Sequence, residues 1–201
     1  MPKIIDHDKR KGEILFQALQ VFAQHGYMDT NLSMIAKACM ISRPTIYQYF
    51  HDKEEIFRFA VKKVTGEMFT KYVSIAFQLD RPVAQRLKEI CSDIVTQGYE
   101  NRDKLTALAD VMVQRKRQGG DFSDIIMKRT VKLNILFKRM LRYGIDGGEF
   151  REIPINEVST QLFTLLESMA FQMALMDQFD PKSSINLVNI FIDHLGKTHP
   201  D

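Results

Sequence analysis

Residues 26–53 read GYMDTNLSMIAKACMISRPTIYQYFHDK, and this stretch decides the fold. Ser42 is suited to cap a helix, because its hydroxyl can accept a hydrogen bond from a main-chain N–H that the first turn leaves unpaired. Pro44 then falls at the second helical position, where proline costs no intrahelical hydrogen bond. Apolar spacing predicts short helices over about 32–39 and 43–50, joined by a turn of three or four residues. Two helices joined in this way form the frame of a helix-turn-helix.

Helical spacing of apolar residues continues on both sides of this stretch. A helix over about 9–25 can end at Gly26, and Asp52 can cap a longer helix that follows the quoted stretch. The last two helices are predicted at about 155–178 and 183–196. No segment alternates with the period of two that a strand needs. The sequence therefore predicts an all-α fold of about nine helices.

Composition allows a globular chain and excludes several classes of protein. The 201 residues are 45% hydrophobic, and a net charge of +3 is compatible with a nucleic-acid partner without requiring one. Cys39 and Cys91 are too few and too far apart for a disulfide framework, and the histidines lack ligand spacing, so we expect no metal or cofactor. There is no apolar signal-peptide core and no apolar run of about 18 residues. We therefore expect a soluble, cytoplasmic protein with no membrane partner.

Two spaced patterns within the quoted stretch resemble a known family. TNLSMIA at 30–36 fits T-x-[LV]-x-x-IA, and SRPTIYQYFHDK at 42–53 fits S-x-x-x-[LI]-Y-x-[YH]-F-x-x-K. Together with the GY pair at the end of the first helix, they resemble the DNA-binding region of the TetR/AcrR family. The matching residues are Gly26, Tyr27, Thr30, Leu32, Ile35, Ala36, Ser42, Ile46, Tyr47, Tyr49, Phe50 and Lys53. After residue 53 the resemblance is one of helical layout.

The resemblance implies that the second short helix enters the major groove of double-stranded DNA. Tyr47, Tyr49 and Lys53 are suited to phosphate oxygens, which set register; the alternative for Tyr47 is a side chain in the core. Base readout is expected from the exposed front of the helix, because arginine suits guanine and glutamine suits adenine. The alternative for Arg43 and Gln48 is a solvated or phosphate-bound side chain. The predicted DNA-binding residues are Thr30, Ser42, Arg43, Pro44, Thr45, Tyr47, Gln48, Tyr49 and Lys53.

A small apolar core is expected beneath the second short helix. Its predicted members are Ile35, Ala36, Ile41, Ile46 and Phe50. The turn between the two helices departs from the family pattern, because Met40 stands where the family usually has glycine. If this turn needs a positive φ, the methionine costs of order 1 kcal/mol there.

The same resemblance implies a helix-turn-helix domain over residues 1–53 and an effector-binding and dimerisation domain over residues 54–201. The second part is rich in methionine and phenylalanine, which suit an adaptable cavity for a small-molecule, largely apolar effector. We predict the effector-binding residues from helix faces that should point inward; the alternative is that they form plain core. They are Cys91, Met112, Phe137, Met169 and Met173. Basic residues such as Lys138 and Arg139 could form a second contact for an anion, but long basic side chains on a helix face are more often solvated.

The last two predicted helices are apolar on more than one face. Phe171 lies beside the main apolar stripe of the first, and Leu187 and Phe191 lie beside that of the second. A surface helix needs only one buried stripe, so the extra apolar width predicts a homodimer contact through both helices. The alternative is deep burial within one chain.

These features predict a ligand-responsive transcription regulator that binds a palindromic operator as a homodimer. That it represses, and that a small molecule releases it, follows from the resemblance alone. The alternative is a helical protein-interaction module that uses the helix-turn-helix only as a scaffold. We expect no enzyme, because GxxxxGK[ST], GxGxxG, HExxH and GxSxG are absent. GGDF at 119–122 lies between predicted helices, whereas the cyclic-dinucleotide synthase signature that it resembles belongs on a β-hairpin.

Overall fold

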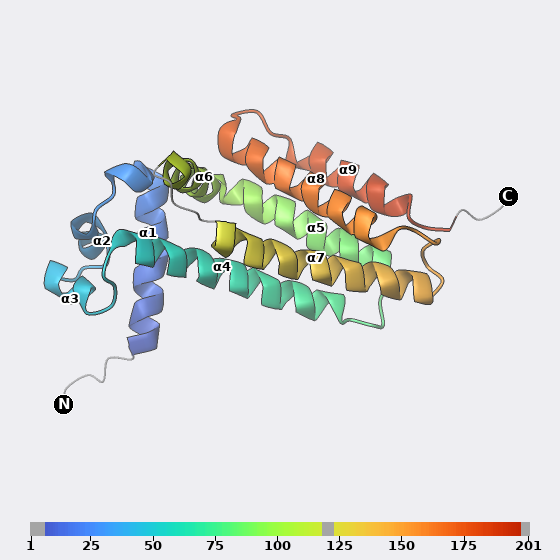
Figure 1. Ribbon diagram of the computed structural model, residues 1–201, viewed down its shortest axis with the longest axis horizontal. Helices are drawn as coiled ribbons and strands as arrows, with labels where there is room; N and C mark the ends of the chain where they lie inside the picture. The colour runs from blue at the N-terminus through green and yellow to red at the C-terminus, as the bar shows by residue number, and fades with distance from the viewer. Residues whose placement is uncertain (1–6, 118–122, 198–201) are drawn as a thin grey trace. The chain divides into compact units, whose positions relative to one another are not determined.

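The computed structural model describes residues 7–117 and 123–197 (Figure 1). These residues form nine α-helices and no strand beyond an isolated bridge between Phe150 and Gly196, which confirms the all-α prediction. The GGDF segment lies outside the described residues. The helices are α1 His7–Asp29, α2 Leu32–Ala38, α3 Arg43–Tyr47, α4 Lys53–Ala76, α5 Val83–Glu100, α6 Arg102–Arg117, α7 Ser123–Asp146, α8 Ile155–Leu175 and α9 Pro181–Asp193.

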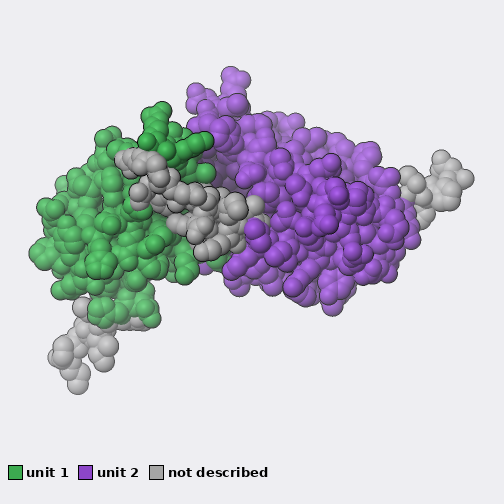
Figure 2. All heavy atoms as spheres, viewed as in Figure 1, with its two compact units in different colours: residues 1–66, 106–122 green, residues 67–105, 123–201 purple. Residues whose placement is uncertain are grey.

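The described residues divide into two compact units (Figure 2). Unit 1 holds residues 7–66 and 106–117, and unit 2 holds residues 67–105 and 123–197. Helices α4 and α6 therefore each contribute to both units. The predicted functional division after residue 53 stays a prediction.

In unit 1, α1 supplies one wall of the core. Ile14, Ala18 and Phe22 are each 0% exposed, as their helical spacing predicts. The ring of Phe22 meets Phe57 of α4 edge-on, with ring centroids 5.4 Å apart. At Gly26 the backbone takes φ 75° and ψ 159°, a conformation that suits glycine, and the helix breaks there before one further turn. The predicted end of the first helix at this glycine is confirmed.

Side chains cap both short helices. Asn31 caps α2 and Ser42 caps α3, each accepting a hydrogen bond from the main-chain N–H three residues on, at 3.1 and 3.2 Å. Pro44 lies in the first turn of α3 as predicted. The predicted helix over 43–50 is shorter in the structure and ends at Tyr47, because the next two N–H groups bond to carbonyls three residues back and tighten the chain into a turn.

Unit 2 is built around an apolar core formed by the later part of α4 with α5, α7, α8 and α9 (Figure 1). Val83, Leu87 and Ile90 are buried on α5, as their spacing predicts. Arg86 of the same helix is 3% exposed, and its Nη1 donates a hydrogen bond to the carbonyl oxygen of Ala76 at the end of α4. A charged side chain thus ties two helices of unit 2 together.

Helices α8 and α9 expose large apolar side chains in the single chain. They are Phe171 (61% exposed), Leu175 (54%), Leu187 (51%) and Ile190 (45%), and Met176 (55%) follows directly after α8. For these residues the alternative of deep burial within one chain is wrong. Across 7–117 and 123–197, no helix is both long and apolar enough to span a bilayer.

Candidate DNA-binding site

The predicted base-reading side chains lie on the outer surface of α3. Arg43 and Pro44 of α3 and Gln48, which directly follows the helix, are exposed, and Thr45 is half-buried. Arg43 also contacts Tyr47, with Nη2 3.4 Å from the phenol oxygen and the guanidinium 5.9 Å from the ring centroid. Tyr47 is 46% exposed, so the alternative of a core tyrosine is wrong. A cation, an amide and a phenol therefore share one solvent-facing surface.

Other predicted DNA contacts also have partners within unit 1. The hydroxyls of Ser42 and Thr45 lie 2.7 Å apart, and Ser42 also accepts from the main-chain N–H of Thr45. These bonds hold the first turn of α3, so the methyl group is the part of Thr45 best placed for a base contact. Tyr49 is half-buried, with its ring centroid 5.3 Å from that of His7.

The core beneath α3 follows the sequence prediction closely. Ile35 and Ile46 are 0% exposed, Phe50 is 1% exposed and Ala36 is 2% exposed. Ile41, the fifth predicted member, is only half-buried. Close packing of these side chains fixes α3 against α2, so the polar surface of α3 is held on a rigid support.

Lys53 and Thr30 make their contacts inside unit 1. The Nζ of Lys53 donates to the carbonyl oxygens of Tyr27, Met28 and Thr30 at 2.7, 2.9 and 2.9 Å. These bonds use all three donors of the ammonium group. Thr30 is 1% exposed, and its hydroxyl donates to the carbonyl oxygen of Gly26 at 2.7 Å. Both side chains thus close the end of α1, and their direct DNA contacts stay a prediction.

Burial also affects the charge of Lys53. Removal from water lowers the pKa of its ammonium group, and the nearby Asp29 carboxylate opposes that shift. The side chain is therefore partly desolvated as well as fully hydrogen-bonded. A sequence pattern could not show this, because the three carbonyl partners lie more than twenty residues away.

The turn between α2 and α3 contains a left-handed residue. Met40 has φ 54° and is the only non-glycine residue with positive φ in the described ranges. The condition under which the sequence predicts a cost at Met40, a positive φ, is therefore met. Its side chain is 91% exposed, so no packing compensates for the strain. Nearby, Arg10 Nη2 donates to the carbonyl oxygen of Cys39 at 3.3 Å, and burial raises the pKa of the Cys39 thiol.

Known proteins share both the helix-turn-helix and the whole fold. Residues 14–59 match the model of bacterial regulatory proteins of the tetR family. A TetR transcription regulator from Haloarcula marismortui is similar in structure, with a TM-score of 0.83 and 18% identity, over 94% of this chain and 100% of that one. Over residues 14–59 the chain belongs to the TetR family of bacterial regulatory proteins. It is therefore a transcription regulator with a DNA-binding helix-turn-helix.

Two relatives of this TetR-family chain extend well beyond the helix-turn-helix. The HTH-type transcriptional regulator HbdR of an Aromatoleum species is 25% identical over 210 residues, which covers 98% of this chain and 86% of HbdR. The uncharacterized HTH-type transcriptional regulator YfiR of Bacillus subtilis is 28% identical over 169 residues, covering 76% of this chain and 73% of YfiR.

Four of the five predicted effector residues of this TetR-family chain lie in the apolar core of unit 2. Cys91 and Phe137 are 0% exposed, and Met169 and Met173 are 4% exposed. Burial raises the pKa of the Cys91 thiol. Such burial suits both a cavity wall and the alternative of plain core, so the effector role stays a prediction. Within the described part of the chain, no group of three or more His, Cys, Asp or Glu could hold a metal ion.

Met112 is placed differently from the other four. It belongs to unit 1 and is 41% exposed, while Ala107 and Val111 form the buried side of α6. The expectation that Met112 points inward is wrong. Residues 107–113 read ALADVMV, and with apolar side chains at nearly every position, spacing cannot select one face.

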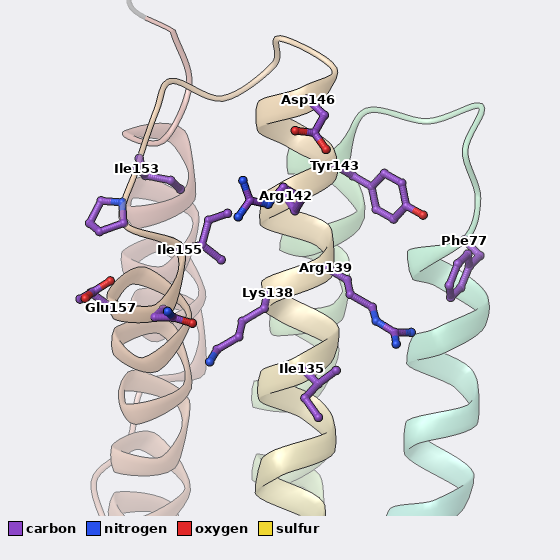
Figure 3. A pocket seen from close by; sticks show the side chains of 12 residues that line it. Phe77, Ile135, Lys138, Arg139, Arg142, Tyr143, Asp146, Ile153, Ile155 and Glu157 are labelled. Carbon is purple, nitrogen blue, oxygen red and sulfur yellow. The ribbon is translucent and has the colours of Figure 1, made fainter.

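Sequence patterns also missed a groove over the outer face of α7 (Figure 3). Lys138, Arg139 and Arg142 line it; for the first two, solvation is the predicted state and a second contact for an anion is the alternative. In the sequence, the three residues are separated from one another by one, three and four positions. This spacing places them on one side of a helix. Nothing in the sequence indicated which other helices would flank them.

Proposed function

We propose that this TetR-family regulator binds a palindromic DNA operator as a homodimer, represses transcription there, and is released by a small, largely apolar effector. One observation carries the DNA-binding part of the proposal. The exposed polar side chains of Arg43 and Tyr47 on α3, and of Gln48 directly after it, lie over a buried apolar core. An apolar surface would have favoured protein contact, so this one argues against the interaction-module alternative.

Each side chain on α3 has a role that its chemistry supports. The guanidinium of Arg43 suits guanine O6 and N7, and the amide of Gln48 suits adenine. Tyr47 places its hydroxyl beside Arg43 and can donate to a phosphate oxygen, which would fix the register of the helix. The ring of Pro44 and the methyl group of Thr45 are suited to a thymine methyl group.

The homodimer part of the proposal rests on the exposed apolar face of α8 and α9. Phe171 and Ile190, 61% and 45% exposed, are large side chains that a stable soluble protein usually covers. A two-fold dimer would bury the same patch on both chains. It would also present two α3 helices to half-sites spaced by one DNA turn, about 34 Å.

The effector part of the proposal rests on the composition of the unit 2 core. Met169 and Met173 lie there beside Phe137 and Cys91, and flexible thioethers can rearrange around an apolar guest. A methyl group added at Gly98 would lie only 3.0 Å from the sulfur of Met173, so the missing side chain leaves room for that methionine. A guest that rearranged this core would alter the helices that connect it to the DNA-binding part.

Selection of random duplexes on the purified protein tests the proposal, followed by binding of the enriched sequence at several salt concentrations. We expect an inverted repeat and an affinity that falls steeply with salt, because phosphate contacts release counterions. An interaction module would enrich no sequence and bind no duplex at low salt. Mass spectrometry of the denatured protein would separate that result from blockage by a co-purified effector.

A further inference from the structure

The groove over α7 lies entirely within unit 2 and has a volume of about 860 Å³ (Figure 3). We call it the α7 groove; it is formed by the outer face of α7 over 135–146, by Phe77 just after α4, and by residues 153–157 at the start of α8. Its size is in the range of small-molecule sites in proteins. None of the predicted effector residues lines it.

Three cationic side chains of α7 enter the α7 groove without ionic partners. No described carboxylate lies within 4.0 Å of the charged groups of Lys138, Arg139 or Arg142. Some other basic residues of unit 2 are paired, as Lys71 is with Asp93 and Lys88 is with Asp193. The groove therefore gathers three cations of α7 that have no ion pair in one concave place.

The cations have different orientations within the α7 groove. Figure 3 shows Lys138 and Arg142 directed toward the side of α8 and Arg139 directed toward the side of α4. The first turn of α8 adds to the positive field, because no side chain caps this 21-residue helix at Pro154. An anion placed over α7 would thus meet guanidinium groups, which bind carboxylates in a bidentate manner, and a helix N-terminus.

Apolar side chains occupy the rest of the α7 groove. Phe77 is 50% exposed, Ile135 is 46% exposed and Tyr143 is 51% exposed, and Ile153 and Ile155 complete the surface from the side of α8. Apolar surface with a polar rim is a feature of ligand-binding grooves. The surface therefore suits a ligand that has both an apolar body and a charged end.

Two carboxylates limit the charge of that ligand. Asp146 and Glu157 also line the α7 groove, opposite in sign to the three cations. The lining carries three positive and two negative side chains, which leaves one positive charge uncompensated. A multiply charged anion would be repelled by the carboxylates, whereas a single negative charge is matched.

We propose that the α7 groove binds a small amphiphile with one negative charge, such as a carboxylate on an apolar chain. Arg142 and Lys138 bind the head group, and Ile135 and Phe77 contact the apolar body. The site is separate from the buried core assigned to the effector, and it does not depend on DNA binding.

Calorimetry on the full-length protein tests this site with decanoate, kept below the concentration at which it forms micelles. Decyltrimethylammonium and decyl maltoside are matched cationic and neutral probes, and phosphatidylglycerol vesicles test for binding to a lipid surface. Arg142→Gln removes a head-group contact, and Ile135→Ser removes an apolar contact; both residues are exposed, so both variants should fold. The matched control is Lys62→Gln, which removes one exposed charge from unit 1.

We expect decanoate to bind the wild type and Lys62→Gln equally, and each groove variant about tenfold more weakly. Undiminished binding by Arg142→Gln would place decanoate elsewhere, for example in the buried core, and would overturn the proposal. Equal binding of the cationic or neutral probe, binding to vesicles alone, or no binding would also overturn it. So would a changed dimer dissociation constant in Arg142→Gln, since that would show that a second chain covers the groove.

Discussion

The Nζ of Lys53 lies 2.7 Å from the carbonyl oxygen of Tyr27 and 4.5 Å from the centroid of the Tyr27 ring. The first residue of α4 therefore closes the end of α1 through a hydrogen bond and a cation–π contact. The sequence pattern predicts a contact between Lys53 and a DNA phosphate. In the structure the side chain of Lys53 stabilises unit 1, which presents α3. We therefore expect a substitution of Lys53 to lower stability as well as DNA affinity.

Lys53→Met should lower the free energy of unfolding by about 2 kcal/mol, because the carbonyl oxygens at the end of α1 lose their donor. Urea denaturation measures the difference. Lys62→Met, an exposed position on the same helix, should change little. If Lys53→Met were as stable as the wild type but bound every duplex more weakly, Lys53 would act mainly as a phosphate contact.

Arg43 and Tyr47 should differ in what their loss does to DNA binding. Arg43→Ala should relax preference at one or two base pairs at a cost of about 1–3 kcal/mol, because a bidentate contact to guanine is lost. Tyr47→Phe should weaken all sequences alike, since a phosphate contact carries no base information. Titration of each variant with the selected operator and with random duplex measures the loss of affinity for both kinds of DNA. An equal loss on both duplexes for Arg43→Ala would remove its base-reading role.

Met40→Gly should raise the free energy of unfolding by about 1 kcal/mol, because φ 54° is strained for a side chain with a Cβ atom and easy for glycine. The exposed methionine side chain makes little packing to lose. Met40→Val should destabilise instead, since a β-branched residue resists the left-handed region. Thermal unfolding of the three proteins checks the order, and a valine variant as stable as the glycine variant would contradict the strain argument.

Two helical glycines should respond oppositely to alanine. A Cβ atom at Gly144 would lie 2.1 Å from the ring of Phe150, which is 1% exposed, so Gly144→Ala should destabilise by about 1–3 kcal/mol. A Cβ atom at Gly66 would meet nothing within 4 Å. Gly66→Ala should therefore stabilise α4 by up to about 1 kcal/mol. Chemical denaturation of both variants shows the signs, and equal shifts would mean that Phe150 moves aside.

Ile190→Glu should dissociate the proposed homodimer without unfolding the chain. Ile190 is 45% exposed in the single chain, so a charge there costs little until a second copy covers it. Sedimentation velocity at several concentrations should show a monomer for this variant and a dimer for the wild type. Gln85→Glu adds the same charge at an exposed position of α5 and should remain dimeric. A dimeric Ile190→Glu protein would place the interface elsewhere.

Local chemistry explains why much of the helix-turn-helix could be predicted. The cap at Ser42, the first-turn Pro44, the break at Gly26 and the positive φ at Met40 each depend on residues within a few positions. The buried Ile46 followed from spacing, since one apolar stripe of α2 and α3 had to face a common core. Spacing could not give the end of α3, because its final turn tightens through hydrogen bonds to carbonyls three residues back.

The remaining features depend on contacts between distant segments. Spacing could not decide that Met112 is exposed, because residues 107–113 of α6 are apolar at nearly every position and only packing selects a face. Nor could it show that Arg142 and Ile155 share a groove, since these side chains come from different helices.

By itself, the sequence determined the all-α class, the helix-turn-helix and its family, because caps, turns and apolar periods act over a few residues. The tertiary structure alone decided that Lys53 is bonded within unit 1, that Met112 is exposed, and that Lys138 and Arg142 share a groove with apolar side chains. The physical reason is that hydrogen bonds, burial and electrostatic interactions depend on distances between atoms in space. The packing of the helices sets those distances.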